Sequence, residues 1–415
     1  MIAVYLSPLY FFGTWLLAYM FLRWLSVCGE KGKLRLFFMR KSVKITVFLL
    51  TFCLSLMIPA GFLLKSCRLK YILLHMGSIW LGVLLYGLLA ATLYIIYCLA
   101  VYIIVKLRLK HGKIPEGTAF ERPAVIARIA GAAAVAAVAA VCIIGVYKAG
   151  NYKTKEYSVN IQKETSIDEL NAVMIADIHL GYNIGCSQVS RIVKKINECN
   201  PDIVFICGDI FDNDIEALDD IEELERLLRS ISSGYGVYAC CGNHDIDEKI
   251  LAGFTFDYDG EKKSSPAMID FLEKSNIHVL SDEGILIDDA FYVFGRRDYS
   301  KPGNKEKSRI TPDMIMDEFA SLYPEKNYPV IVLDHEPKES KLLDRAGCDL
   351  VLSGHTHDGQ IFPGNILLAA LYENSYGYKK YNTLQEIVTS GAGLFGPYMR
   401  VGTDAEICRI KIRFR

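Results

Sequence analysis

The chain has 415 residues, of which 52% are hydrophobic and 22% are charged, and its formal net charge is -1. This length allows one large domain and a second unit. Residues 1–148 are dominated by apolar runs, whereas residues 151–415 have the mixed charge of a globular domain, so the composition excludes a single uniform soluble domain. The net charge averages two unlike halves and identifies no partner. No basic, aromatic-interleaved stretch indicates nucleic-acid binding.

Four apolar stretches in the first half are each long enough, at about 20 residues, to cross a hydrocarbon core as a helix. They lie near residues 2–22, 43–64, 77–105 and 124–147. We therefore predict an all-α, four-helix transmembrane region over residues 1–150. The first stretch lacks a preceding basic region, so we expect a retained span and not a cleaved signal peptide. Almost no charge lies within the spans, which favours an anchor that contacts membrane lipids over a transport path.

Lysine and arginine collect in the loops at 23–42 and 106–123, whereas the loop at 65–70 holds three basic residues. Because cytoplasmic loops carry the excess of basic residues, the catalytic half is expected outside the cytoplasm of a multi-pass membrane protein. Seven unpatterned cysteines in residues 151–415 point the other way, since exported domains usually pair their cysteines. A reducing exterior would reconcile the two signals.

In the second half, short β-branched runs alternate with helical patterns between residues 172 and 240, which is typical of βαβ units. Strand-like runs continue between residues 277 and 414. This number of strands favours two packed sheets with helices outside, within one domain of residues 151–415. The polar exit at 151–156 is short, so the domain should lie close to the bilayer.

Five polar fragments each follow one of these strand-like runs, and they contain five of the chain's eight histidines. The fragments are Asp177-Ile178-His179, Gly208-Asp209-Ile210-Phe211-Asp212, Gly242-Asn243-His244-Asp245, Asp334-His335 and Gly354-His355-Thr356-His357. Ligands in open α/β sheets gather at the carboxyl ends of strands. Asp, His and Asn without Cys suit Mn, Fe or Zn, and Mg is also compatible. Seven candidate ligands are too many for one ion and fit two divalent ions that share a carboxylate.

In this order the fragments resemble the calcineurin-like metallophosphoesterases, over residues 155–415. The run His357-Asp358-Gly359-Gln360 and the tail Ser390-Gly391-Ala392-Gly393 look like those of bacterial membrane-associated phosphodiesterases of the YkuE/YaeI kind. Asp358 departs from the glycine expected in that subgroup. The resemblance implies an α/β fold, a four-layer α/β/β/α sandwich.

The resemblance also implies a role for each candidate residue. The first metal is expected on Asp177, His179 and His357. The second is expected on Asn243, His335 and His355, and Asp209 is expected to bridge the two. His244 is the catalytic histidine left for the scissile phosphate. Substrate binding is assigned to Asn243, His244 and Arg400, although Arg400 could equally pair with a carboxylate. Asp212 or Asp245 is expected to orient ligands.

Two neighbouring cations lower the pKa of a water between them, so we expect phosphodiester or pyrophosphate bonds to be hydrolysed by metal-activated hydroxide. A membrane-anchored domain would meet lipid-linked substrates such as UDP-diacylglucosamine. The alternative is a catalytically degenerate membrane receptor or transporter-associated binding domain. It is disfavoured because no expected ligand is missing. Oligomeric state is not readable from the sequence.

Overall fold

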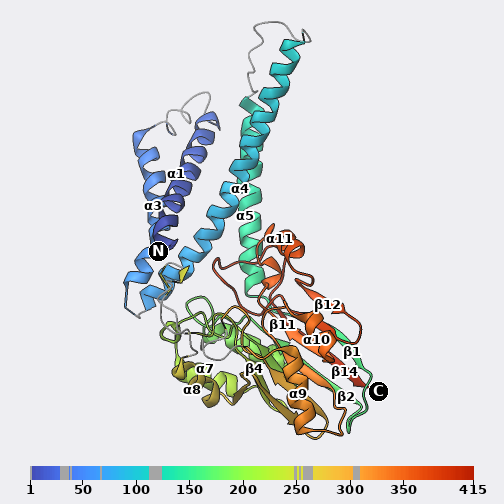
Figure 1. Ribbon diagram of the computed structural model, residues 1–415. Coiled ribbons are helices and arrows are strands. Elements are labelled where there is room, and N and C mark those ends of the chain that lie inside the picture. The colour runs from blue at the N-terminus through green and yellow to red at the C-terminus, as the bar shows by residue number, and fades with distance from the viewer. Residues whose placement is uncertain are drawn as a thin grey trace. The chain divides into compact units, whose positions relative to one another are not determined.

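The computed structural model describes residues 2–28, 37, 40–65, 68–111, 124–246, 250–251, 254–255, 265–301 and 309–415 (Figure 1). The chain forms two compact units, Met1–Ile144 and Gly145–Arg415.

The first unit is made of long apolar helices, as the hydropathy predicted. They are α1 (Ile2–Cys28), α3 (Lys41–Leu63), α4 (Arg68–Lys110) and α5 (Ala124–Ala149), whose last turn belongs to the second unit. All four are long and apolar enough to cross a membrane, which confirms the four-helix region. At 43 residues, α4 is about twice as long as one span requires.

Glycines let α3 and α4 approach each other closely. A Cβ atom at Gly61 would lie 2.7 Å from Leu74, and one at Gly77 would lie 2.5 Å from Ile58. Small residues at such contacts are typical of helix pairs in membranes, where van der Waals packing replaces the hydrophobic effect. Most of the two basic loops, namely residues 29–36, 38–39 and 112–123, lies outside the described residues, so the orientation stays a prediction.

The second unit is built on two six-stranded sheets. In sheet order the first contains β1 (Lys153–Ile161), β14 (Glu406–Phe414), β2 (Glu169–Ile175), β3 (Ile203–Cys207), β4 (Val237–Cys240) and β7 (Ile277–Val279). The second contains β12 (Gly377–Lys380), β13 (Gln385–Val388), β11 (Leu350–Ser353), β10 (Val330–Leu333), β9 (Phe291–Gly295) and β8 (Glu283–Ile287). A separate pair joins β5 (Ile250–Leu251) to β6 (Phe254–Thr255). The strands β2, β3, β4 and β7 are parallel neighbours, as are β9, β10, β11 and β13.

The two sheets pack face to face around one apolar core. Phe205 and Ile410 from the first sheet meet Phe291 and Leu333 from the second in that core. A second core joins the outer face of the second sheet to α9 (Pro312–Leu322) and α10 (Ser340–Ala346). The first sheet is accompanied by α6 (Cys186–Glu198), α7 (Ile221–Arg229) and α8 (Pro266–Lys274). The predicted sandwich of two sheets with outer helices is confirmed.

Helical spacing explains how an outer helix attaches. In α6 the buried residues Val189, Ile192, Val193 and Ile196 recur at the i, i+3, i+4, i+7 spacing of one helical face. In α7 the side chain of Asp220 caps the helix by accepting a hydrogen bond from the Glu223 backbone N–H. These helices brace the parallel strands, whose carboxyl ends carry the polar fragments described next.

Candidate metal centre

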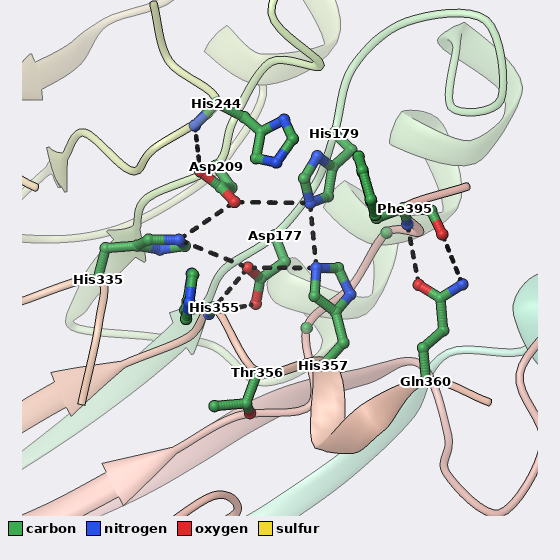
Figure 2. Close-up of polar contacts among 12 residues, drawn as sticks. Asp177, His179, Asp209, His244, His335, His355, Thr356, His357, Gln360 and Phe395 are labelled. Carbon is green, nitrogen blue, oxygen red and sulfur yellow. Dashed lines mark hydrogen bonds and ion pairs between the residues drawn. The ribbon is translucent and has the colours of Figure 1, made fainter. Parts of the chain in front are cut away.

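The five polar fragments converge at the carboxyl ends of β2, β3 and β4 in one sheet and of β10 and β11 in the other (Figure 2). Parallel strands deliver their carboxyl ends to the same edge of a sheet, and the face-to-face packing brings the two edges together. Residues up to 180 positions apart in the chain are thereby brought within a few Å.

Asp177, His179 and His357 form one group of candidate ligands. His357 Nε2 lies 3.6 Å from Asp177 Oδ1 and 3.1 Å from His179 Nε2. In the absence of a metal, one ring can donate its N–H to the lone pair of the other, and in tautomers with both lone pairs facing each other the two nitrogens can bind the same cation. All three side chains are buried.

Asp209, His335 and His355 form a second group. His335 Nε2 is 3.1 Å from Asp209 Oδ2, which in turn is 3.7 Å from His179 Nε2 in the first group. Asn243 joins the second group because its Oδ1 is 2.9 Å from His355 Nδ1. Asp209 therefore lies between the two groups, where a bridging ligand would have to be.

His244 lies beside the two groups and contacts polar neighbours of its own. Its ring contacts Asn213 Oδ1, and its Nδ1 is 3.7 Å from Asp212 Oδ1. Asp212 also lies 3.9 Å from His179 Nδ1, so its carboxylate can orient both rings. His179, Asp212 and His244 could themselves hold an ion. Because His179 belongs to the first group as well, this arrangement competes with that group and does not add to it.

Several candidate ligands have a backbone in the left-handed region, a conformation that residues other than glycine rarely adopt. They are Asp177, His179, Asp209, His355 and His357, with φ between +51° and +71°. Such conformations cost about 1–3 kcal/mol each and persist where the surroundings fix them, commonly at functional sites. Asp358 also has φ of +49°, which gives a physical reason for the glycine expected there.

Burial sets the protonation of these groups. It lowers the pKa of His179 to about 3 and that of His355 to about 4, so both rings are neutral near pH 7, the form in which imidazole binds metals. Burial raises the pKa of Asp177 to about 7. Burial also opposes the charge on Asp209, but the neighbouring His335 and His244 outweigh it and hold the pKa of Asp209 well below its usual range.

The donor set fits divalent metal ions. His335 Nδ1 lies 2.8 Å from the Cys207 carbonyl oxygen, and this contact holds the ring with its Nε2 toward Asp209. That Nε2 atom is buried and has no hydrogen-bond partner among the described residues. Nitrogen and oxygen donors without thiolate match Mn, Fe, Zn or Mg.

Asp334, Asp245 and Arg400 were singled out in the sequence and lie away from the ligand groups. Asp334 pairs with Arg296 at 2.7 Å. Asp245 accepts hydrogen bonds from the backbone N–H groups of Phe211 at 2.9 Å and Gly242 at 2.7 Å, and so ties two ligand loops together.

Arg400 is fully buried, and burial lowers its pKa to about 10. Its guanidinium donates to the backbone carbonyls of Ser390, Gly391 and Gly393 at 2.7–3.0 Å. Arg400 therefore fixes the loop at 390–393, which lies against Asp177. This geometry favours a positioning role over direct contact with substrate.

Two further residues at the centre were not expected from the sequence. Glu336 is buried, with Oε2 3.5 Å from His355 Nε2, and only its place next to His335 could have indicated it. Phe395 packs its ring 4.9 Å from the His244 ring and 5.8 Å from the His179 ring, measured between centroids. Little in the sequence indicated that Phe395 would lie at the centre, because it is a single aromatic residue in a glycine-rich tail. The described cysteines of this unit are all thiols, without disulfides.

Two glycines of the tail allow a matched test of the loop that Arg400 holds. Gly391 and Gly396 both have positive φ, at +81° and +71°, but a Cβ at Gly391 would lie 2.7 Å from Asp177 Cβ whereas one at Gly396 meets nothing within 4 Å. Gly396→Ala should cost only the left-handed strain, about 1–2 kcal/mol. Gly391→Ala should cost more and weaken manganese binding by about tenfold or more, since it displaces a ligand.

Thermal unfolding and a manganese titration of the two variants check this prediction. Equal metal affinity in Gly391→Ala and Gly396→Ala would show that Asp177 is not held by this loop.

Comparison with known proteins agrees with the geometry. The sequence family of calcineurin-like phosphoesterases matches this chain over residues 170–359. An uncharacterized metallophosphoesterase of Campylobacter jejuni is 31% identical over 267 residues, covering 63% of this chain and 64% of the relative. A transmembrane protein with metallophosphoesterase domain of Danio rerio is 32% identical over 267 residues, covering 63% of this chain and 57% of the relative. The match thus spans less than two thirds of either relative. The UDP-2,3-diacylglucosamine pyrophosphatase LpxG of Chlamydia trachomatis is 23% identical over 234 residues, covering 48% of this chain and 67% of that protein.

Proposed function

Since the chain carries a calcineurin-like metallophosphoesterase domain at residues 170–359, we propose that it is a membrane-anchored phosphoesterase that uses two divalent metal ions. The observation that carries the proposal is Asp209, whose carboxylate lies between the His335 group and the His179 group. Asp177, His179 and His357 would hold one ion, and Asn243, His335 and His355 the other. Manganese is the ion that we expect, with iron, zinc or magnesium as alternatives.

When bound, the ions supply Lewis acidity and an activated water for in-line displacement at phosphorus. The chain's own residues prepare that chemistry. Asp212 and Asn213 hold the His244 ring beside the centre, where it can protonate the leaving oxygen or donate a hydrogen bond to the phosphoryl group. The Phe395 ring covers His244 and His179 on one side and limits the access of bulk water.

For the substrate, we infer phosphodiester or pyrophosphate bonds, with lipid-linked molecules as the preferred class. Two observations support this inference. Four helices able to cross a membrane precede the domain, and one distant relative is named as a UDP-2,3-diacylglucosamine pyrophosphatase. From the loop charges we further propose a multi-pass protein with the domain outside the cytoplasm.

A catalytically degenerate binding domain is the competing candidate. It would require the loss of at least one ligand, yet all seven predicted ligands lie within the two groups or against them.

The test is hydrolysis of bis-p-nitrophenyl phosphate by the full chain in detergent. Chelation with EDTA should abolish hydrolysis, and added manganese should restore it. The reading fails if the chain that binds manganese hydrolyses neither this diester nor an aryl pyrophosphate.

A further inference from the structure

An apolar helix leaves its aliphatic side chains exposed next to the metal centre. This helix, α11 (Gly364–Leu371), has no buried residue, and Ile366, Leu367 and Leu371 are 61%, 61% and 68% exposed. Phe362, just before the helix, is 44% exposed. From residue 359 to 372 the sequence holds no charged side chain. Scattered exposed aliphatic residues are ordinary, but a contiguous uncharged segment of this kind marks an interaction surface.

Both ends of this segment are fixed to the metal centre. At its start, Gln360 follows the short helix η2 (His357–Gly359) and exchanges two hydrogen bonds with the Phe395 backbone, at 2.8 and 2.9 Å. At its end, the Tyr372 ring lies 6.3 Å from the His355 ring. The apolar helix therefore forms part of the rim of the site.

The same segment is linked through residues 400–401 to the last part of α5. Gly145, in the final turn of α5, accepts a hydrogen bond from the Arg400 N–H at 2.9 Å. The next residue, Val401, donates to Gln360 O at 2.9 Å and accepts from Phe362 N at 2.8 Å. The candidate membrane span of α5 runs to Ala149, and its last residues, from Gly145 on, belong to the same unit as the apolar segment.

A cavity of about 410 Å³ adjoins the other end of α11. Leu371 and Tyr372 supply an apolar wall, and Lys338, Lys341 and Glu373 supply charged groups, of which Lys341 and Glu373 pair with each other. Lys338 pairs with Glu336, which lies 3.5 Å from His355 Nε2, so the cavity is next to the metal centre. An apolar wall beside charged pairs is a lining that fits the interfacial layer of a bilayer, where acyl chains give way to polar headgroups.

We propose that α11 and Phe362 insert into the interfacial layer of the bilayer, and that the metal centre thereby acts on phosphoesters of membrane lipids. A lipid surface is the occupant favoured over a second copy of the chain, because the segment is uncharged and is linked through Val401 and Arg400 to the last residues of a candidate membrane span. The second half of this proposal rests on the proposed phosphoesterase function. The insertion itself does not.

Photocrosslinking in vesicles tests the insertion. The photoreactive residue p-benzoylphenylalanine replaces Leu367 in the full chain, in phosphatidylcholine vesicles that contain a radiolabelled phosphatidylcholine. The matched control carries the same residue at Leu322, which is 55% exposed at the end of α9. We expect a lipid adduct at position 367 several-fold above that at position 322. Equal yields, or an adduct to a second copy of the chain, would overturn the insertion.

A paired kinetic assay tests the consequence for substrates. The combined variant Ile366→Asn with Leu367→Asn changes only exposed side chains that do not line the cavity, so its fold should be retained. Its hydrolysis of a water-soluble aryl phosphodiester should be unchanged. Its kcat/KM for a diacylglyceryl p-nitrophenyl phosphate in phosphatidylcholine vesicles should fall roughly tenfold. A matched variant, Met314→Asn with Leu322→Asn, should leave both activities unchanged.

The two proposals fail in different ways. Equal losses on the soluble and the vesicle-borne substrate would refute the lipid consequence. If the unmodified chain hydrolysed neither substrate, the phosphoesterase function would fail, while the crosslinking result would still decide whether α11 enters the bilayer.

Discussion

Asp209→Asn should lower kcat/KM for an aryl phosphodiester by about 10³-fold or more, since changes around metal ligands alone cost about 10–100-fold. Asp209 Oδ2 lies 3.1 Å from His335 Nε2 and 3.7 Å from His179 Nε2, so its charge serves both ligand groups. The amide keeps the shape and can still accept the hydrogen bond from the His244 N–H to Oδ1, at 2.8 Å. The effect should therefore come from lost metal binding and not from unfolding.

Steady-state hydrolysis and manganese content of the Asp209→Asn chain check this expectation. Asp404→Asn is the control, because the Asp404 carboxylate forms ion pairs with Lys148 and Lys153. It should leave both quantities unchanged. If Asp209→Asn kept activity within about tenfold of the parent, the bridging role would be wrong.

His244→Ala should lower kcat by about 10²–10³-fold while manganese stays bound, since a positioned general acid contributes on that order. The His244 ring is held by Asn213 and Asp212 beside the ligand groups. If the ring protonates the leaving oxygen, the loss should be larger for an alkyl than for a p-nitrophenyl leaving group, because the latter needs no proton. The kcat values of the parent and His244→Ala for a diester with an alkyl leaving group and one with a p-nitrophenyl leaving group measure this difference.

The matched control is His278→Ala, which removes a histidine from β7 that is exposed and stacks on Tyr238. Its kcat should equal that of the parent. Loss of manganese from His244→Ala would instead make His244 a metal ligand, in the alternative group with His179 and Asp212.

Much of the fold could be predicted, because the spacing of hydrophobic residues and the local composition both depend on which residues are buried. The strands that carry ligands are short runs of β-branched and apolar residues; β3, β4, β10 and β11 are buried throughout, and β2 is buried from Ala172 on. The resemblance to metallophosphoesterases is confirmed by the family match. By contrast, hydropathy placed one span at 77–105, yet α4 runs over Arg68–Lys110. The helix extends through the apolar run from Tyr71 to Met76 and through basic turns at both ends, Arg68–Lys70 and Lys106–Lys110.

The part of the candidate site that could be predicted is the set of ligands that directly follow parallel strands. The order of the five fragments indicated that Asp177, Asp209 and His335 would meet, because the carboxyl ends of parallel strands share an edge. Glu336 and Phe395 could not be placed, since they reach the centre only through loop geometry. The burial of Arg400 was likewise unreadable, because an arginine in a glycine-rich tail has the same sequence signal whether it faces substrate or backbone carbonyls.

The most direct test of the account is a manganese titration of the metal-free full chain, with bound metal and diester hydrolysis measured on the same samples. We predict that hydrolysis rises until about two equivalents are bound per chain, as a two-ion site requires. The Asp209→Asn chain should hold less metal and show no such rise. Saturation of hydrolysis at one equivalent, or binding without hydrolysis, would contradict the two-ion phosphoesterase.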